Sequence, residues 1–391
     1  MKRFILNPFI LYIGAYLFVI VLYQFKWSEL FPPLSSQLMV FLIVTFFVSF
    51  ILGCVFYSKK REIVSRITLS DSFFSKSITC ISLGYFLEFI YAHQIPLLSV
   101  SLTDDSFIHF GGIPTFHVIL VTYNVFFDII FFQKNLQSKV DKRKWFAFAA
   151  IAVLPPIVIV NRGMLFTVAI ACILMYLIMT SQRVKSLIIK CGIFAFVLLA
   201  GFALLGSLRI HDEGNRAFVS YAEPSSGFLK TNLNPLVLWP YMYIASPMAN
   251  LQYCIDNAIP EYDFPRFITE CICPDVISKR LVINKEISSV KSSNCLISPV
   301  FNVSTMYNTA YITMGYYGML LMFFYQSFIV VVFLLISYRK KNQYYTVCFC
   351  LICSNIILGT FSNMWVFSAI SFPILWSPIF NILSRCKITA K

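Results

Sequence analysis

Residues 38–57 read LMVFLIVTFFVSFILGCVFY, a run of twenty residues without a charged side chain. A transmembrane helix needs about 20 mostly apolar residues to cross the roughly 30 Å of hydrocarbon in a bilayer. The run therefore has the length and composition of a complete membrane crossing. It shows no alternation of apolar and polar residues, so it predicts a helix rather than a strand of a membrane barrel.

Similar apolar runs recur along the whole chain of 391 residues. We predict ten transmembrane helices, at residues 4–23, 38–57, 78–93, 113–132, 145–160, 164–180, 187–206, 310–337, 344–360 and 364–383. The predicted fold class is thus an all-α polytopic membrane protein. It has three parts: a bundle of seven spans (1–206), a long hydrophilic loop (207–309) and three further spans (310–391).

The composition agrees with this fold class. Hydrophobic residues make up 59% of the chain and charged residues 12%, whereas soluble domains are about a quarter charged. This excludes a soluble enzyme, a disordered chain and a nucleic-acid-binding module.

Membrane topology explains the formal net charge of +14. If the N-terminus lies in the cytoplasm, every predicted cytoplasmic loop contains Lys or Arg, as the positive-inside rule requires. We therefore expect both termini in the cytoplasm and the loop 207–309 on the opposite side of the membrane.

Residues 236–255, LVLWPYMYIASPMANLQYCI, are apolar but carry Pro240, Pro247 and Asn250. Counting them as a span would reverse the orientation of all that follows and place the basic residues 339–341 outside. We therefore interpret them as a re-entrant or interfacial helix pair, which is tolerated where protein or water covers the backbone.

The long loop contains four of the twelve cysteines, Cys254, Cys271, Cys273 and Cys295. In an oxidising compartment they allow two disulfides, but the sequence does not give the pairing. The spacing Cys271-x-Cys273 does not match a zinc site, so no metal is expected.

Three arginines near the outer membrane edge are candidates for binding a diphosphate. Arg162 lies in VNRGM, the whole connection between two spans, where we expect Gly163 to form a tight turn. A guanidinium beside a helix N-terminus favours anions, although a snorkelling arginine is the alternative. Arg209 and Arg216 follow the seventh span, but Asp212 and Glu213 are candidate ion-pair partners for both.

Candidates for proton transfer lie close to the same edge. Glu88 is about one turn inside the outer end of the third span, where burial of a carboxylate is costly and indicates either function or a structural hydrogen bond. His117 begins the fourth span, and His211 lies beside the arginines. Each histidine could accept a proton from a hydroxyl, but a single histidine is more often a satisfied polar residue. We interpret Asp128, near the inner end of the fourth span, as structural.

Several of these stretches together resemble the Wzy-type O-antigen polymerases. They are GYFLEFI (84–90), IPLL (95–98), FGGIPTFH (110–117), NRG (161–163), FNVSTMY (301–307) and GYYG (315–318). The resemblance implies an inner-membrane glycosyltransferase, similar in architecture to other lipid-linked glycosyltransferases, that joins oligosaccharide repeat units carried on undecaprenyl diphosphate. It implies an active site that faces the periplasm, and it implies neither a metal nor another cofactor.

With this resemblance, Arg162, Arg209 and Arg216 become candidates for binding the substrate diphosphate, and Glu88, His117 and His211 become candidates for the catalytic base. The expected partners are the lipid-linked oligosaccharides, the bilayer and a polysaccharide chain-length regulator. The segment around His211 matches no family pattern, so roles within the long loop stay open. Two alternatives remain, namely an O-antigen ligase and a non-enzymatic flippase or transporter.

Overall fold

The computed structural model describes residues 2–57, 64–100, 110–138, 140–180, 215–281, 295–339 and 342–389. Within these ranges the chain is helical and contains no β-strand. Five helices in the described ranges are long and apolar enough to cross a membrane: α3 (Ser36–Val55), α4 (Asp71–Ala92), α6 (Phe116–Gln137), α8 (Arg162–Met179) and α16 (Asn308–Arg339). These helices indicate an α-helical membrane protein.

Helices also occupy the other expected spans that fall in the described ranges, while residues 187–206 lie outside them. The additional helices are α2 (Pro8–Tyr23), α7 (Lys142–Val158) and α17 (Tyr345–Leu358). The expected span 364–383 is divided into α18 (Ser368–Ser371), the 3₁₀-helix η4 (Phe372–Leu375) and α19 (Trp376–Thr389). The count of ten membrane crossings stays a prediction.

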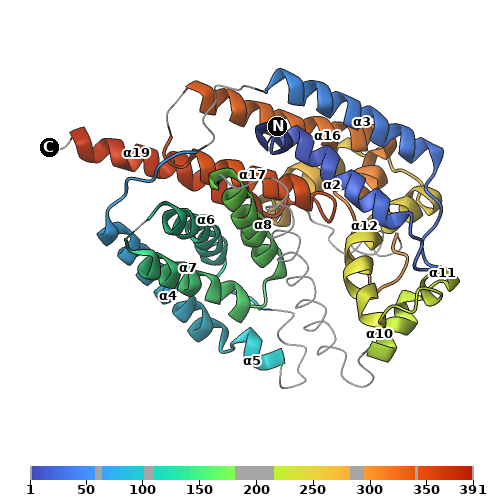
Figure 1. Cartoon of the computed structure of the whole chain (residues 1–391), viewed down its shortest axis with the longest axis horizontal. Coiled ribbons are helices and arrows are strands. Elements are labelled where there is room, and N and C mark those ends of the chain that lie inside the picture. The colour runs from blue at the N-terminus through green and yellow to red at the C-terminus, as the bar shows by residue number, and fades with distance from the viewer. Residues whose placement is uncertain are drawn as a thin grey trace. The chain divides into compact units, whose positions relative to one another are not determined.

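Contacts between helices divide the chain into two compact units, each built from separate stretches of sequence (Figure 1). Unit 1 comprises Met1–Tyr57, Gln182–Ile329 and Ile356–Val366, and unit 2 comprises Ser58–Ser181, Val330–Asn355 and Phe367–Lys391. These units cut across the expected boundaries at 206 and 309, because α2 packs against a helix from the long loop.

The shorter helices complete the two units. Those of unit 1 are α1 (Lys2–Ile5), α10 (Asn215–Ala222), α11 (Ser226–Leu229), η2 (Pro235–Val237), α12 (Leu238–Asn257), α13 (Phe264–Phe267), the π-helix η3 (Ile268–Ile272) and α14 (Asp275–Leu281). Unit 2 adds α5 (Pro96–Val100).

Buried tyrosines link the helices of unit 1. The Tyr12 hydroxyl of α2 donates to Oγ1 of Thr45 on α3 at 3.1 Å and lies 2.6 Å from the Tyr307 hydroxyl. One turn further along α2, the Tyr16 hydroxyl donates to the carbonyl of Gly359 at 3.1 Å. Burial of a tyrosine hydroxyl costs free energy unless the hydroxyl is hydrogen-bonded. These hydrogen bonds therefore fix how α2, α3 and the chain entering α16 meet.

The segment expected to form a helix pair contains one continuous helix, α12, with Pro247 inside it. Asn250 is buried and anchors this helix. Its Nδ2 donates to the carbonyls of Phe301 and Val303 at 2.6 and 2.7 Å, and its Oδ1 accepts from the amide of Ile297 at 2.8 Å. The asparagine that the sequence marks as unusual in an apolar run thus ties α12 to the chain that leads into α16.

Gly315 interrupts α16, with φ 60° and ψ −149°. Such a conformation takes the amides after Gly315 away from the carbonyls of the preceding turn. Backbone amides of the loop replace them: Glu261 donates to the carbonyl of Ile312 at 2.9 Å, and Asp263 donates to that of Thr313 at 3.0 Å. The carbonyls of Ile312 and Thr313 therefore both stay hydrogen-bonded at the break.

Aromatic rings hold one end of unit 2 together. The Phe74 ring of α4 lies 5.8 Å from Phe131 of α6 and 4.9 Å from Trp145 of α7, measured between ring centroids. Phe74 is near the start of α4, Phe131 is near the end of α6, and Trp145 is near the start of α7. Helix α6 therefore runs antiparallel to both α4 and α7, whereas α4 and α7 begin at the same end of the unit.

Outward-facing apolar side chains agree with a membrane environment. On α3 the exposed large hydrophobic residues are Val40, Ile43, Val44, Phe47, Phe50, Ile51 and Val55, with exposed fractions from 45 to 68%. An apolar face of this extent is unusual on a soluble protein. Lipid would cover it without loss of free energy.

Candidate functional site

The structure brings two of the predicted proton-transfer residues into direct contact. Glu88 lies one turn before the end of α4, and His117 is the second residue of α6. Glu88 Oε2 and His117 Nδ1 are 2.7 Å apart. The carboxylate side chain is completely buried, whereas 26% of the imidazole surface is exposed. The site is thus a buried acid that holds a partly accessible histidine.

Helix geometry explains why these residues meet. Glu88 follows Phe74 by 14 residues on α4, and His117 precedes Phe131 by 14 residues on α6, which is about 21 Å along each helix. Since Phe74 contacts Phe131 and the helices are antiparallel, Glu88 and His117 lie opposite each other at the other end. Gly84 allows the close approach, because a Cβ there would lie 2.5 Å from Leu120 Cδ1.

Gly112 lies directly against the pair. A Cβ on this residue would lie 2.6 Å from His117 Nδ1 and 2.7 Å from Glu88 Oε1, which is closer than a carbon can come. The Phe110 ring packs edge-on to His117, with 5.7 Å between centroids. Gly112 lies within the motif FGGIPTFH, but no role for it follows from the sequence alone. The two glycines just before a candidate histidine were the signal that was available.

The contact with Glu88 sets what His117 can do. A carboxylate that accepts a hydrogen bond at Nδ1 assigns the proton of the neutral imidazole to that atom and leaves Nε2 as the acceptor. It also stabilises the imidazolium that forms when Nε2 takes a proton. Within the described part of the chain, the buried Glu88 Oε1 has no hydrogen-bond partner. The arrangement is suited to general base catalysis.

Arg162 is the first residue of α8 and is partly exposed. The Asn161 side chain caps the helix by accepting from the Met164 amide at 3.0 Å. Trp145 contacts Phe74 at the end of unit 2 where α4 begins. From Trp145, α7 runs about 20 Å to its own end. The turn between α7 and α8 therefore lies at the end of unit 2 that holds Glu88 and His117.

The expectation that Gly163 forms the tight turn between the two spans is wrong. Val160 takes the left-handed conformation instead, with φ 53°. Gly163 lies inside α8, where a Cβ would be 3.1 Å from Ile370 Cδ1. The glycine serves close packing of α8 against α18, and the chain reverses direction at Val160, three residues earlier than expected.

The remaining candidates fall only partly within the described residues. Arg209 and His211 lie outside the described residues. Arg216 is the second residue of α10 in unit 1, whereas Glu88, His117 and Arg162 all belong to unit 2. Asp128 is buried on α6, where its Oδ2 accepts from Asn124 Nδ2 at 3.3 Å. Asn124 also donates to the carbonyl of Ala152 on α7 at 3.2 Å, so Asp128 belongs to a contact between helices.

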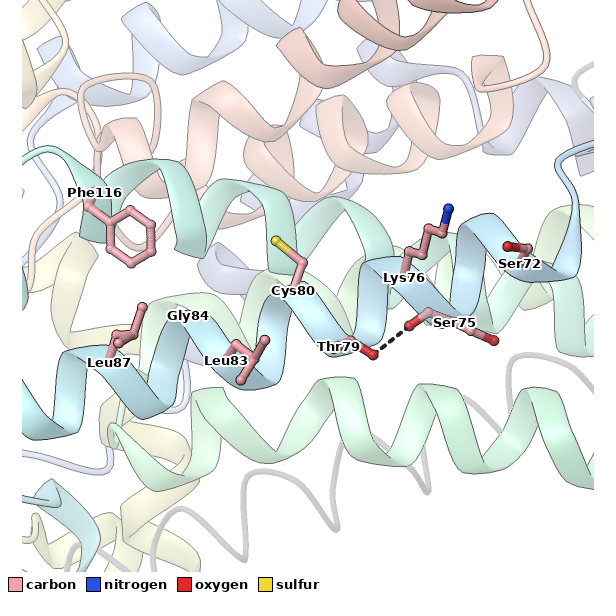
Figure 2. Close-up of a pocket in the computed structure, with 9 residues that line it drawn as sticks. All are labelled: Ser72, Ser75, Lys76, Thr79, Cys80, Leu83, Gly84, Leu87 and Phe116. Atoms are coloured by element: carbon pink, nitrogen blue, oxygen red, sulfur yellow. Dashed lines mark hydrogen bonds between the residues drawn. The ribbon is translucent and has the colours of Figure 1, made fainter.

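A groove follows one face of α4 (Figure 2). Its lining residues are Ser72, Ser75, Lys76, Thr79, Cys80, Leu83, Gly84, Leu87 and Phe116. The small and polar residues lie toward the start of α4, and Leu83, Leu87 and Phe116 lie toward its end. Leu87 and Phe116 are the chain neighbours of Glu88 and His117. The apolar part of the groove is thus formed by residues adjacent in sequence to Glu88 and His117, which do not themselves line it.

Comparison with known proteins adds no relative. No protein-family model matches this chain, and no match is found to a curated protein or to a solved structure. A function for this chain must therefore be inferred from the geometry of unit 2 and from short sequence motifs.

Proposed function

We propose that this protein is a membrane glycosyltransferase that polymerises oligosaccharide repeat units carried on undecaprenyl diphosphate. The reaction takes place at the periplasmic face of the bacterial inner membrane and builds O-antigen or a related surface polysaccharide. One observation carries the proposal: a fully buried glutamate lies 2.7 Å from a partly exposed histidine at the end of two apolar helices. A base at the membrane edge is what attack by a sugar hydroxyl on a lipid-linked donor requires.

In the proposed reaction, a hydroxyl of the incoming repeat unit attacks the anomeric carbon of the growing chain. The new glycosidic bond forms as the bond from that carbon to the diphosphate oxygen breaks. The hydroxyl proton passes to Nε2 of His117, and the Glu88 carboxylate stabilises the resulting imidazolium. Undecaprenyl diphosphate leaves with the electron pair of the broken bond.

Arg162 is proposed to bind the leaving diphosphate. Its guanidinium is a fixed cation with a planar set of donors that matches phosphate oxygens. Its place at the first position of α8 adds the partial positive charge of a helix N-terminus. Negative charge that develops on the diphosphate would be stabilised by both.

The groove on α4 suits the lipid part of the substrate. Its apolar end is formed by Leu83, Leu87 and Phe116, and in a bilayer it would open to the acyl chains. A polyprenyl chain lying along this groove would place its diphosphate at the membrane edge, next to Glu88 and His117. This supports a lipid-linked sugar over a soluble nucleotide sugar as the donor.

The test is a gel of surface polysaccharide from a strain that lacks this gene, complemented with wild type, Arg162→Ala or His117→Ala. We expect the deletion to leave lipid A-core carrying a single repeat unit, and neither variant to restore the ladder. Two controls keep the fold and leave the site intact. Arg143→Ala removes an exposed arginine at the start of α7, and His93→Asn keeps a residue that tolerates the left-handed conformation, with φ 52°.

The outcomes separate the proposal from its alternatives. Bare core with no repeat unit would indicate a ligase or a flippase, because both act where units must reach the core. An unchanged ladder would remove the protein from this pathway. A ladder restored in full by His117→Ala would leave the pathway intact but exclude this histidine as the base.

A further inference from the structure

Two of the four cysteines in the long loop lie together. Cys254 is on α12 and is completely buried, and Cys295 begins the next described segment with 5% of its surface exposed. The two side chains are close enough for each thiol to shift the pKa of the other. The other loop cysteines are engaged differently, since the Cys271 thiol contacts Thr313 Oγ1 at 4.0 Å.

The Asn250 side chain holds the two segments that carry these cysteines against each other. Asn250 precedes Cys254 by one helical turn, and its Oδ1 accepts from the amide of Ile297 at 2.8 Å. Ile297 follows Cys295 by two residues. The same asparagine binds the carbonyls of Phe301 and Val303. The face of α12 that carries Cys254 is therefore fixed against the segment that carries Cys295, independently of the thiols.

We propose that Cys254 and Cys295 form a disulfide in the mature protein, closing a loop that joins α12 to the chain entering α16. This rests on the proposed periplasmic location of residues 207–309, because disulfides persist in oxidising compartments. Geometry selects this pair from the four cysteines, a choice that the sequence leaves open.

The chemistry is thiol–disulfide exchange with an oxidised dithiol protein of the periplasm. One cysteine of the pair attacks the donor disulfide as a thiolate and forms a mixed disulfide. The second thiolate then displaces the donor, which leaves with two electrons and two protons as a dithiol. The nearby Cys254 thiol lowers the pKa of Cys295, and the Cys295 thiol together with burial raises the pKa of Cys254. Because both side chains are buried after folding, exchange occurs as the loop folds, and the finished bond is shielded from reductants.

The experiment is differential thiol labelling of the full chain in its own membranes. Membranes are denatured in SDS with N-ethylmaleimide so that every free thiol reacts, and the proteins are then reduced, labelled with iodoacetamide, digested and analysed by mass spectrometry. We expect the iodoacetamide label on Cys254 and Cys295 and the maleimide on Cys271 and Cys273. In a Cys254→Ser variant, Cys295 should change to the maleimide label, whereas Cys271→Ser should leave the pair unchanged. Maleimide on Cys254 and Cys295 of the wild-type chain would overturn the proposal.

A topology arm separates this failure from failure of the proposed function. Ile259 follows α12 and is 90% exposed, so an Ile259→Cys variant reports on which side the loop lies. Labelling by a membrane-impermeant maleimide from outside, together with reduced Cys254 and Cys295, would overturn the disulfide alone. Labelling only after the membrane is permeabilised would overturn the periplasmic location and, with it, both proposals.

Discussion

Glu88 and His117 have different roles in the proposed site: Glu88 orients the imidazole, and His117 meets the substrate. The imidazole is partly accessible and can meet a substrate, while the carboxylate is buried behind it. Glu88→Gln keeps the size of the side chain and an oxygen that accepts from Nδ1, but it loses the charge that stabilises an imidazolium. We expect it to lower the polymerisation rate about 100-fold with normal expression. A purified protein acting on lipid-linked repeat units measures this, and a rate near wild type would contradict the role given to Glu88.

Gly112 offers a test that leaves both polar side chains in place. In Gly112→Ala the new methyl group would overlap His117 Nδ1 and Glu88 Oε1, so the pair must separate. We expect activity to fall about 10- to 100-fold, because small displacements of catalytic groups are costly. Gly227→Ala is the matched control, since its Cβ would meet only Ser225 Oγ at 3.4 Å. Full activity of Gly112→Ala would mean that the contact at 2.7 Å is not needed.

At this scale the sequence predicts some residues and misses others for physical reasons. A carboxylate in an apolar run is conspicuous, so Glu88 could be selected without a structure. Its pairing with His117 depends on the packing of α4 against α6, which a single sequence does not encode locally. The role of Gly112 is visible only in the structure, where a Cβ would overlap His117 and Glu88. The turn falls at Val160, although the nearby Gly163 is the residue that the sequence favours for a turn.

Among the helices, α16 shows best how an element departs from its hydropathy. The apolar run at 310–337 predicts one span that is longer than a bilayer needs. Gly315 divides it, and residues 316–336 then extend about 31 Å, close to the thickness of the hydrocarbon. Hydropathy detects the whole run, while the break depends on a loop that docks from elsewhere in the chain.

The conformation of Gly315 leads to a stability prediction. Its φ of 60° and ψ of −149° are accessible to glycine alone, and a Cβ would also lie 3.3 Å from Pro260 Cγ. We expect Gly315→Ala to reduce the free energy of unfolding by about 1–3 kcal/mol, seen as a lower Tm in detergent. Gly14→Ala in α2 is the control, because nothing lies within 4 Å of its Cβ. Equal Tm values for both variants would argue against the break.

For the whole molecule, hydropathy predicts where helices lie better than how they group. The five long helices coincide with expected spans, since a buried or lipid-facing helix must be apolar in any arrangement. The grouping of α2 and α3 with residues of the long loop in unit 1 was not predicted. It depends on side-chain contacts between distant segments, such as Tyr12 with Tyr307.

The orientation of the whole chain in the membrane can be tested with reporter fusions. We expect green fluorescent protein fused after the C-terminus to fluoresce, and alkaline phosphatase inserted between α12 and α13 to be active. Both results follow from the placement of Lys and Arg in the predicted cytoplasmic loops. Active phosphatase at the C-terminus would reverse the orientation and place Arg162 and His117 on the cytoplasmic side.

The break in α16 also has a consequence for biogenesis. By length and hydropathy, residues 308–336 form one apolar segment that the insertion machinery can accept as a whole. Bending at Gly315 exposes the carbonyls of Ile312 and Thr313, and only the amides of Glu261 and Asp263 cover them. Those amides precede α16 in the chain, but they can bond its carbonyls only after the loop that carries them has folded. We therefore expect insertion and bending to be separate events, with the second waiting on maturation of the loop.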